Sequence, residues 1–534
     1  EDLLRKITWI LGIALSLALG CPTVDDDDSA GDDDTTGDDD DACDPLAPGA
    51  LATWEGAGPL DVGDVAELTF DEGEVSFTLD GDGGDYLAVV ISLSQQNDTT
   101  YPLEVEGGAA AIAPPPTVDP SAPPVFEPPR VEDPVPVPDP IGDSSVPEVG
   151  DIRTFEVYGM LGAFEVEAEA LAVSDSVIVY MDITTEHDLP ALDEDYIADS
   201  LELFEGIVLP RERFFFHQEP DVNEDGHISL LFSYTVNAQG IVAYVTQCDL
   251  QPQDVCGYGN EQEVIYANIP DPEGNYYEPH ALAELLAHEF NHTIYFASKY
   301  LDNDAVDVDE NVYITEGMSA LAQDLSGYNN GNQYVWGMML DDIPNASMTD
   351  VYVKEPGTHY YGQRDGTLRG VGASSMRYLY DRFGPEVGHD DGTFDVTCGV
   401  EYLHDWFATP EAGLDAVLET TELEADTFFA DYWTALGVHQ QVDEGVAADP
   451  AYHFQPQVED PLTGYMRGID LYTTIHGWLE LSGPMSSSLE GSSDHDLRSG
   501  GAVYLLAEGL DEELTVSLST DDSARAIVRM IRLD

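Results

Sequence analysis

Two histidines and a glutamate in the segment 278–297 have the residue types and the spacing of a zinc site. The segment reads EPHALAELLAHEFNHTIYFA, and His288 and His292 are four residues apart. Residues at this spacing lie on one face of a helix, so the two imidazoles can bind one Zn²⁺. Glu289 lies beside that metal, where its carboxylate can take a proton from a zinc-bound water. The HExxH pattern therefore predicts zinc-assisted hydrolysis, with Glu289 as general base and acid.

The same segment has the pattern of a buried amphipathic helix. Pro279 suits a first helical turn. Apolar side chains recur every four residues and form a stripe that must be buried: Leu282, Leu286, Phe290 and Ile294. The alternative is a helix that carries two solvated or core histidines and no metal.

A catalytic zinc usually has three protein ligands and one water. The best candidate for the third ligand is Glu316, which lies 24 residues after His292 in the helix-like segment ITEGMSALAQDLSG. Other acidic residues compete for this role: Asp304, Asp307, Asp309, Glu310 and Asp324. Gly317 and Ala320 are small enough to let the two helices approach closely.

HEFNH followed by TEGMSALAQDL resembles the gluzincin metallopeptidases, most closely the hyicolysin-like family. PDVNEDGHISLLF, NEQEVIYANI and GASSMRYLYDRFG are also similar to segments of that family. The resemblance covers about residues 150–440 and implies a thermolysin-like zincin domain, in which a mixed sheet lies over the HExxH helix beside a helical second lobe. It also implies that Glu316 is the third ligand. In the expected reaction, zinc polarises the scissile carbonyl. Thr315 departs from the family, which commonly has Asn at that position.

A tetrahedral oxyanion needs stabilisation beyond the metal. Enzymes of the resembling family use a Tyr or His of the second lobe, which makes Tyr360 and His359 of the segment THYYG candidates. Packing of these aromatic side chains against the core is the alternative.

A second metal is suggested by the segment DVNEDGHI. Asp221, Asn223 and Asp225 match the first half of a calcium loop, but Phe232 stands where an EF-hand needs Glu. A looser Ca²⁺ site and a plain Asp/Asn/Gly turn before a strand explain these residues equally well.

The charge balance excludes one class of partner. The chain has 106 acidic residues against 17 Lys plus Arg, a formal net charge of −89. Nucleic-acid binding needs a basic face, so we expect no nucleic-acid partner.

The N-terminus resembles a bacterial lipoprotein signal. Basic residues precede the apolar run 7–19, which ends in Ala-Leu-Gly-Cys21. This pattern predicts a signal peptide over 1–20 and a lipid on Cys21. The Asp-rich stretch 21–44 is then a disordered tether. We therefore expect an exported protein in the bacterial cell envelope that touches the membrane only through its anchor and faces the periplasm or exterior, with release from the cell as an alternative.

The rest of the chain divides at a Pro-rich linker. Residues 113–149 contain 13 of the 33 prolines. Short strand patterns predict one β domain over 45–112 and another over 446–534, and they flank the catalytic domain at 150–445. The expected fold class is therefore α+β. Cleavage in the linker would make the first β domain a propeptide, an alternative that the sequence leaves open.

Four cysteines remain once Cys21 is lipidated, an even number that favours disulfides in an exported chain. Cys248 and Cys256 close a short loop and are the preferred pair, while Cys43 with Cys398 follows by elimination.

The leading hypothesis is a zinc metalloendopeptidase that acts on a protein or peptide substrate. The rival is a surface lipoprotein that binds partners through its β domains and carries a degenerate peptidase core. An aminopeptidase is less favoured, because no motif for a substrate amine is visible.

Overall fold

The computed structural model describes residues 49–108 and 141–534. Short gaps in these ranges fall at 160–161, 185–186, 188, 190, 273–276, 303–309, 355–359, 361, 389–393, 444–448, 453, 456 and 476–478. The predicted signal peptide, Cys21, the Asp-rich tether and most of the Pro-rich linker lie outside the described residues. The described part mixes helices and strands, which confirms the α+β class. Within it, no helix is long and apolar enough to cross a membrane.

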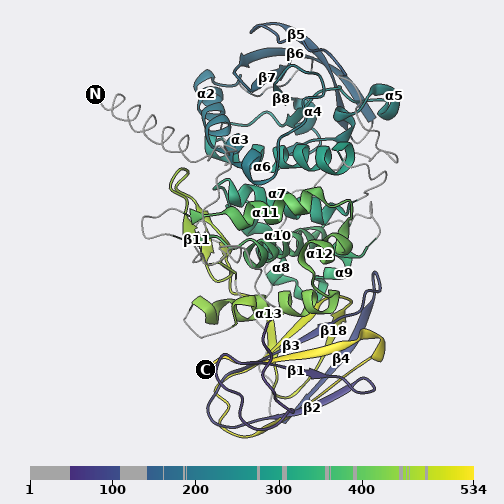
Figure 1. Ribbon diagram of the computed structural model, residues 1–534, viewed down its shortest axis with the longest axis vertical. Coiled ribbons are helices and arrows are strands. Elements are labelled where there is room, and N and C mark those ends of the chain that lie inside the picture. Colours follow the sequence, from purple (N-terminus) through teal and green to yellow (C-terminus); the bar gives the residue numbers. More distant parts are fainter. Residues whose placement is uncertain are drawn as a thin grey trace, which may run out of the picture. The chain divides into compact units, whose positions relative to one another are not determined.

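Strands from both flanks of the chain form one β-sandwich, not two separate β domains. Figure 1 shows the purple N-terminal strands interleaved with the yellow C-terminal strands. The first sheet has the order β1 (Val65–Thr69), β21 (Ala526–Arg532), β3 (Tyr86–Ser92), β19 (Ala502–Ala507) and β17 (Ser486–Ser488). The second has the order β18 (Ser492–Arg498), β4 (Thr100–Gly107), β20 (Leu514–Thr520) and β2 (Glu74–Leu79).

The burial patterns of the strands follow from this arrangement. In β4 buried and exposed residues alternate, because one face meets the other sheet and one faces solvent. Every residue of β3 is buried. Its Ala88 and Val90 lie in the sandwich core, whereas Leu87 and Val89 join the core of the helical region. Helix α13 (Ala425–Asp443) covers that second face of β3.

A six-stranded mixed sheet opens the region expected to be catalytic. Its order is β5 (Ile152–Gly159), β6 (Gly162–Val173), β7 (Val177–Asp182), β8 (Ile228–Phe232), β10 (Val264–Ala267) and β9 (Ala243–Tyr244). Strands β7, β8 and β10 are parallel, and the edge strand β9 runs antiparallel to β10. The apolar stripe of helix α6 (Pro279–Phe296) joins residues of β7, β8 and β10 in one core, as the sequence pattern predicts.

The helical stretch that follows β7 is a composite. It runs as α2 (Glu194–Leu203), a π-helical turn (Phe204–Val208) and α3 (Leu209–Phe215). Asp193 caps its start, because its carboxylate accepts the amide of Asp195.

The second half of this region is helical. It contains α7 (Val312–Leu325), α8 (Asn332–Asp341), α9 (Met348–Tyr352), α10 (Gln363–Phe383), α11 (Thr397–Ala408), α12 (Gly413–Thr421) and α13. The C-terminal cap residue of α10 is Gly384.

The predicted disulfide between Cys248 and Cys256 is present. Cys398 is also disulfide-bonded, and its predicted partner Cys43 lies outside the described residues.

The segment 446–534, expected to be one β domain, does not belong to the sandwich over its whole length. Residues between α13 and β17 form short hairpins, and their apolar side chains Ile469, Leu471 and Leu481 belong to the helical core. Only the residues from β17 onward contribute strands to the sandwich.

Candidate metal centre

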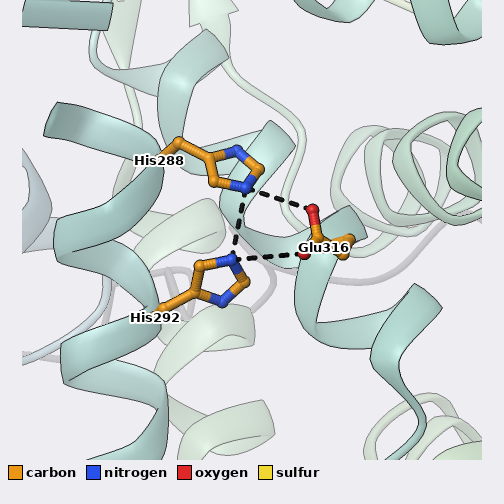
Figure 2. Close-up of side chains that lie close together, drawn as sticks. All are labelled: His288, His292 and Glu316. Carbon is orange, nitrogen blue, oxygen red and sulfur yellow. Dashed lines mark hydrogen bonds and ion pairs between the residues drawn. The ribbon is translucent and has the colours of Figure 1, made fainter. Parts of the chain in front are cut away.

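Helix α6 presents His288 and His292 on the side opposite its buried stripe. Leu282, Phe290 and Ile294 are at most 5% exposed and anchor the helix against the sheet. Because the helix is fixed on that face, its two histidines project together toward α7 (Figure 2).

Glu316 completes a group of three ligand-type side chains. It lies in the second turn of α7, whose start is capped by Asn311 through the amide of Tyr313. The Nε2 atom of His288 lies 3.2 Å from Glu316 Oε2 and 3.2 Å from the Nε2 atom of His292. His292 Nε2 lies 3.7 Å from Glu316 Oε1.

These distances suit one metal ion. Two nitrogens bound to a tetrahedral zinc at about 2.0–2.1 Å lie about 3.3–3.4 Å apart. The imidazole nitrogens are already at 3.2 Å. Among the described residues, this is the one group of three His, Cys, Asp or Glu side chains whose ligand atoms lie within 4.8 Å of each other. The donor set of two nitrogens and one carboxylate oxygen fits zinc.

Neighbouring groups orient the three side chains. The Nδ1 atom of His288 lies 3.1 Å from Gln323 Oε1, which favours the tautomer that leaves Nε2 free for a metal. A guanidinium nitrogen of Arg369, on α10, forms an ion pair with Glu316 Oε2. Burial opposes ionisation of Glu316, but the charge of Arg369 and the hydrogen bond to His288 outweigh it and hold the pKa of Glu316 well below its usual range.

Glu289 is buried beside this group. Its side chain does not join the ligand set, and the residue is 6% exposed. Burial raises the pKa of Glu289 to about 7, and the charge of Glu316 adds to this effect, while His288 and Arg369 oppose it. A carboxyl group with a pKa near neutrality can both accept and return a proton.

Helix α7 is held by a close crossing with α10. A Cβ atom added to Gly317 would lie 2.6 Å from the backbone of Gly372, and one added to Gly372 would lie 2.1 Å from the carbonyl oxygen of Tyr313. Gly317 was expected to let α7 approach the histidine helix, but this glycine faces α10. Thr315, the residue that departs from the resembling family, donates its hydroxyl to Val312 within α7.

Two of the competing acidic residues are engaged elsewhere. Glu310 accepts hydrogen bonds from Tyr295 and from the amide of Gly413. Asp324 forms an ion pair with Arg377 and accepts the amide of Gly468. The other three candidates, Asp304, Asp307 and Asp309, lie outside the described residues.

The Tyr360 side chain is directed to a different cluster. Its hydroxyl bonds to Asp98 and Lys354, and the ammonium of Lys354 and the guanidinium of Arg364 lie 3.7 and 3.5 Å from its ring centre. None of these contacts is with a proposed metal ligand, and the role of Tyr360 at an oxyanion stays a prediction. His359 lies outside the described residues.

The suggested calcium residues form a turn before β8. The Gly226 amide donates to Asp221, the Asp225 amide donates to Asn223, and the Asn223 amide group donates to Asp225. These oxygens accept hydrogen bonds within the turn, as in a plain Asp/Asn/Gly turn, and a calcium ion at this place stays a prediction.

Arg369 and Gln323 are contacts of the metal centre that the sequence reasoning did not find. Gln323 had a detectable signal, because it lies seven residues after Glu316 and so shares its face of α7. For Arg369 the sequence gave only a general signal. Basic residues are scarce in this chain, and a buried basic side chain must find an acidic partner.

Comparison with known proteins assigns the chain to no family. No family model matches the sequence, and no curated protein matches it.

Proposed function

We propose that this protein is a zinc-dependent metallopeptidase of the gluzincin type. The observation that carries the proposal is the convergence of His288, His292 and Glu316 beside the buried carboxyl group of Glu289. The spacing in the sequence and the resemblance propose these three ligands, and the closeness of their ligand atoms, all within 4.8 Å of one another, supports the proposal.

In this proposal the Nε2 atoms of His288 and His292 and a carboxylate oxygen of Glu316 would hold zinc. Bound zinc would supply Lewis-acid chemistry, polarising a carbonyl group and lowering the pKa of water. Glu289 takes a proton from the attacking water and delivers it to the leaving amine nitrogen. Its pKa near 7 suits both transfers.

The arrangement of elements supports the same proposal. Helix α6 lies against a mixed sheet whose edge strand β9 is antiparallel, and Glu316 comes from the helical half that follows. This is the organisation that the resemblance to thermolysin-like zincins implies. The likeness is one of architecture, and the chemistry is argued from the site.

We further propose an endopeptidase that acts on protein or peptide substrates at the bacterial cell envelope. The lipoprotein-like signal ending at Cys21 supports export and anchoring. The net charge of −89 speaks against a nucleic-acid partner.

The test combines zinc quantification with a protease assay. We expect one zinc per chain and a chelator-sensitive activity on casein or a peptide library. Glu289→Gln should keep the zinc and lose the activity, because the amide cannot accept a proton. Glu284→Gln is the matched control: it changes a half-buried carboxyl group of the same helix that accepts the Gly331 amide, and it should keep both.

Two results would contradict the proposal in different ways. Wild-type digestion by the Glu289→Gln variant would remove Glu289 from the mechanism. A purified chain that binds no zinc would favour the rival, a lipoprotein that binds partners through its β-sandwich.

A further inference from the structure

We infer that Arg369 is a positioning residue that holds the Glu316 carboxylate in place for the metal. The inference rests on the zinc-binding part of the proposed function and not on the reaction. Arg369 is an unusual neighbour for Glu316, because it is a cation in contact with a side chain that is proposed to bind another cation.

The contact is direct and largely shielded from solvent. A guanidinium nitrogen of Arg369 meets Glu316 Oε2, and the two side chains are 11% and 13% exposed. The same oxygen lies 3.2 Å from His288 Nε2, while Oε1 is the oxygen nearer to His292. Arg369 therefore engages the oxygen that also faces His288, while the other oxygen faces His292.

Arg369 is itself held on its other side. Its Nε atom donates to Asp365 Oδ2 at 3.0 Å, one turn earlier on α10. The second oxygen of Asp365 accepts the hydroxyl of Tyr313 at 3.1 Å, and that hydroxyl accepts the backbone amide of Tyr360. A guanidinium fixed by two carboxylates through different nitrogens has little freedom to rotate.

This arrangement matches the role of outer groups around metal ligands. A ligating carboxylate needs hydrogen bonds to set its orientation, and losing such a partner typically weakens metal binding 10- to 100-fold. Within α7 and α10, the Gly317–Gly372 crossing sets the distance between helix axes, but it does not fix the torsions of the Glu316 side chain. The Asp365–Arg369 pair supplies that constraint.

The opposite effect is physically reasonable too. If Arg369 competed with zinc for Glu316, removing it would tighten zinc binding. Positioning and competition therefore predict changes of opposite sign, so a binding measurement decides between them.

The experiment measures zinc affinity of the full chain by competition with a chromophoric chelator, and the absorption spectrum of the cobalt-substituted protein. We expect Arg369→Gln to weaken zinc binding 10- to 100-fold and to change the cobalt spectrum, because Glu316 is no longer held. Arg369→Lys, which keeps the charge, should recover part of the affinity. Arg525→Gln removes an arginine from an exposed pair with Asp426 and should behave as the wild type in both measurements.

Asp365→Asn provides a second line if the Arg369→Gln variant fails to fold. It retains Arg369 but removes the charge of the carboxylate that holds it, so zinc binding should weaken and the cobalt spectrum should change. Unchanged or tighter zinc binding in the folded variants would overturn the inference while leaving the zinc site intact. Absence of zinc from the wild-type protein would instead overturn the proposed function, and this inference with it.

Discussion

The crossing of α7 and α10 at Gly317 and Gly372 gives a sharp prediction. In Gly372→Ala, the new methyl group would lie 2.1 Å from the carbonyl oxygen of Tyr313. Contacts of a Cβ atom below 3.0 Å essentially do not occur, so the two backbones must separate locally by about 0.9 Å. Neither atom belongs to a flexible side chain, and no rotamer change can relieve the clash.

We expect Gly372→Ala to lower the free energy of unfolding by about 1–3 kcal/mol, the usual effect of overpacking. It should also weaken zinc binding, because α7 carries Glu316 and a ligand set tolerates shifts of only about 0.5 Å. Urea denaturation followed by tryptophan fluorescence is a suitable assay, since Trp336, Trp406 and Trp433 are buried in the helical region. The chelator competition described above reports zinc binding.

Gly206→Ala is the matched control. It makes the same chemical change at a helical position where an added Cβ meets nothing within 4 Å. It should leave stability unchanged or raise it by up to about 1 kcal/mol, because alanine favours helix. If Gly372→Ala unfolds at the same urea concentration as the wild type, the argument from close helix approach is wrong.

Two further predictions concern groups away from the metal. Burial raises the pKa of Glu263 to about 8, so the folded state keeps a proton that the unfolded chain loses above about pH 4.5, and stability falls as the pH rises between these values. Glu263→Gln can still accept the Val222 amide. Its stability should therefore exceed that of the wild type by a margin that grows as the pH rises in that window, by up to about 1.4 kcal/mol per pH unit. If the melting temperatures of the two proteins differ by the same amount at every pH from 5 to 8, this prediction is wrong. Cys256→Ser should cost about 2.5 kcal/mol, the loop entropy released by a disulfide that joins residues eight apart; a reductant should shift the unfolding midpoint of the wild type toward that of the variant, and no shift would refute this.

The sequence predicts local relations better than distant ones. The four-residue spacing of His288 and His292 sets their common face, and the apolar stripe sets which face is buried. Both follow from helical geometry alone. Glu316 could be proposed because its helix begins soon after the first and the resemblance supplies the pairing. The structure brings the three side chains together, while the identity of the metal and the reaction remain predictions.

The contact between Arg369 and Glu316 lay beyond such reasoning. Arg369 is on a different helix, and its position depends on how α10 crosses α7. That crossing depends in turn on two glycines whose roles are visible only in three dimensions. The contact of Tyr360 with Asp98 was hidden for a related reason, because Asp98 lies 262 residues earlier, in a loop between two sandwich strands.

The sequence could not show that the N-terminal and C-terminal strands form one sandwich, because this too depends on contacts between distant parts of the chain. Alternating patterns show that a strand has one buried face, but they do not show which strand it pairs with. The unbroken apolar run of β3 was a sign that both its faces are covered. The partner on its second face, α13, could not be named from the sequence.

The interleaving of the sandwich strands also bears on proteolytic processing. Strand β21 lies between β1 and β3, and β20 lies between β2 and β4, so the N-terminal strands are hydrogen-bonded mainly to C-terminal ones. A cut between β4 and β5 would divide the chain without releasing its first part. The nicked protein should remain one particle under native conditions, and its two fragments should separate only on denaturation. The N-terminal segment is thus poorly suited to being a propeptide that dissociates after cleavage. It is better described as half of one β-sandwich, in which hydrogen bonds join the N-terminal strands to the C-terminal ones.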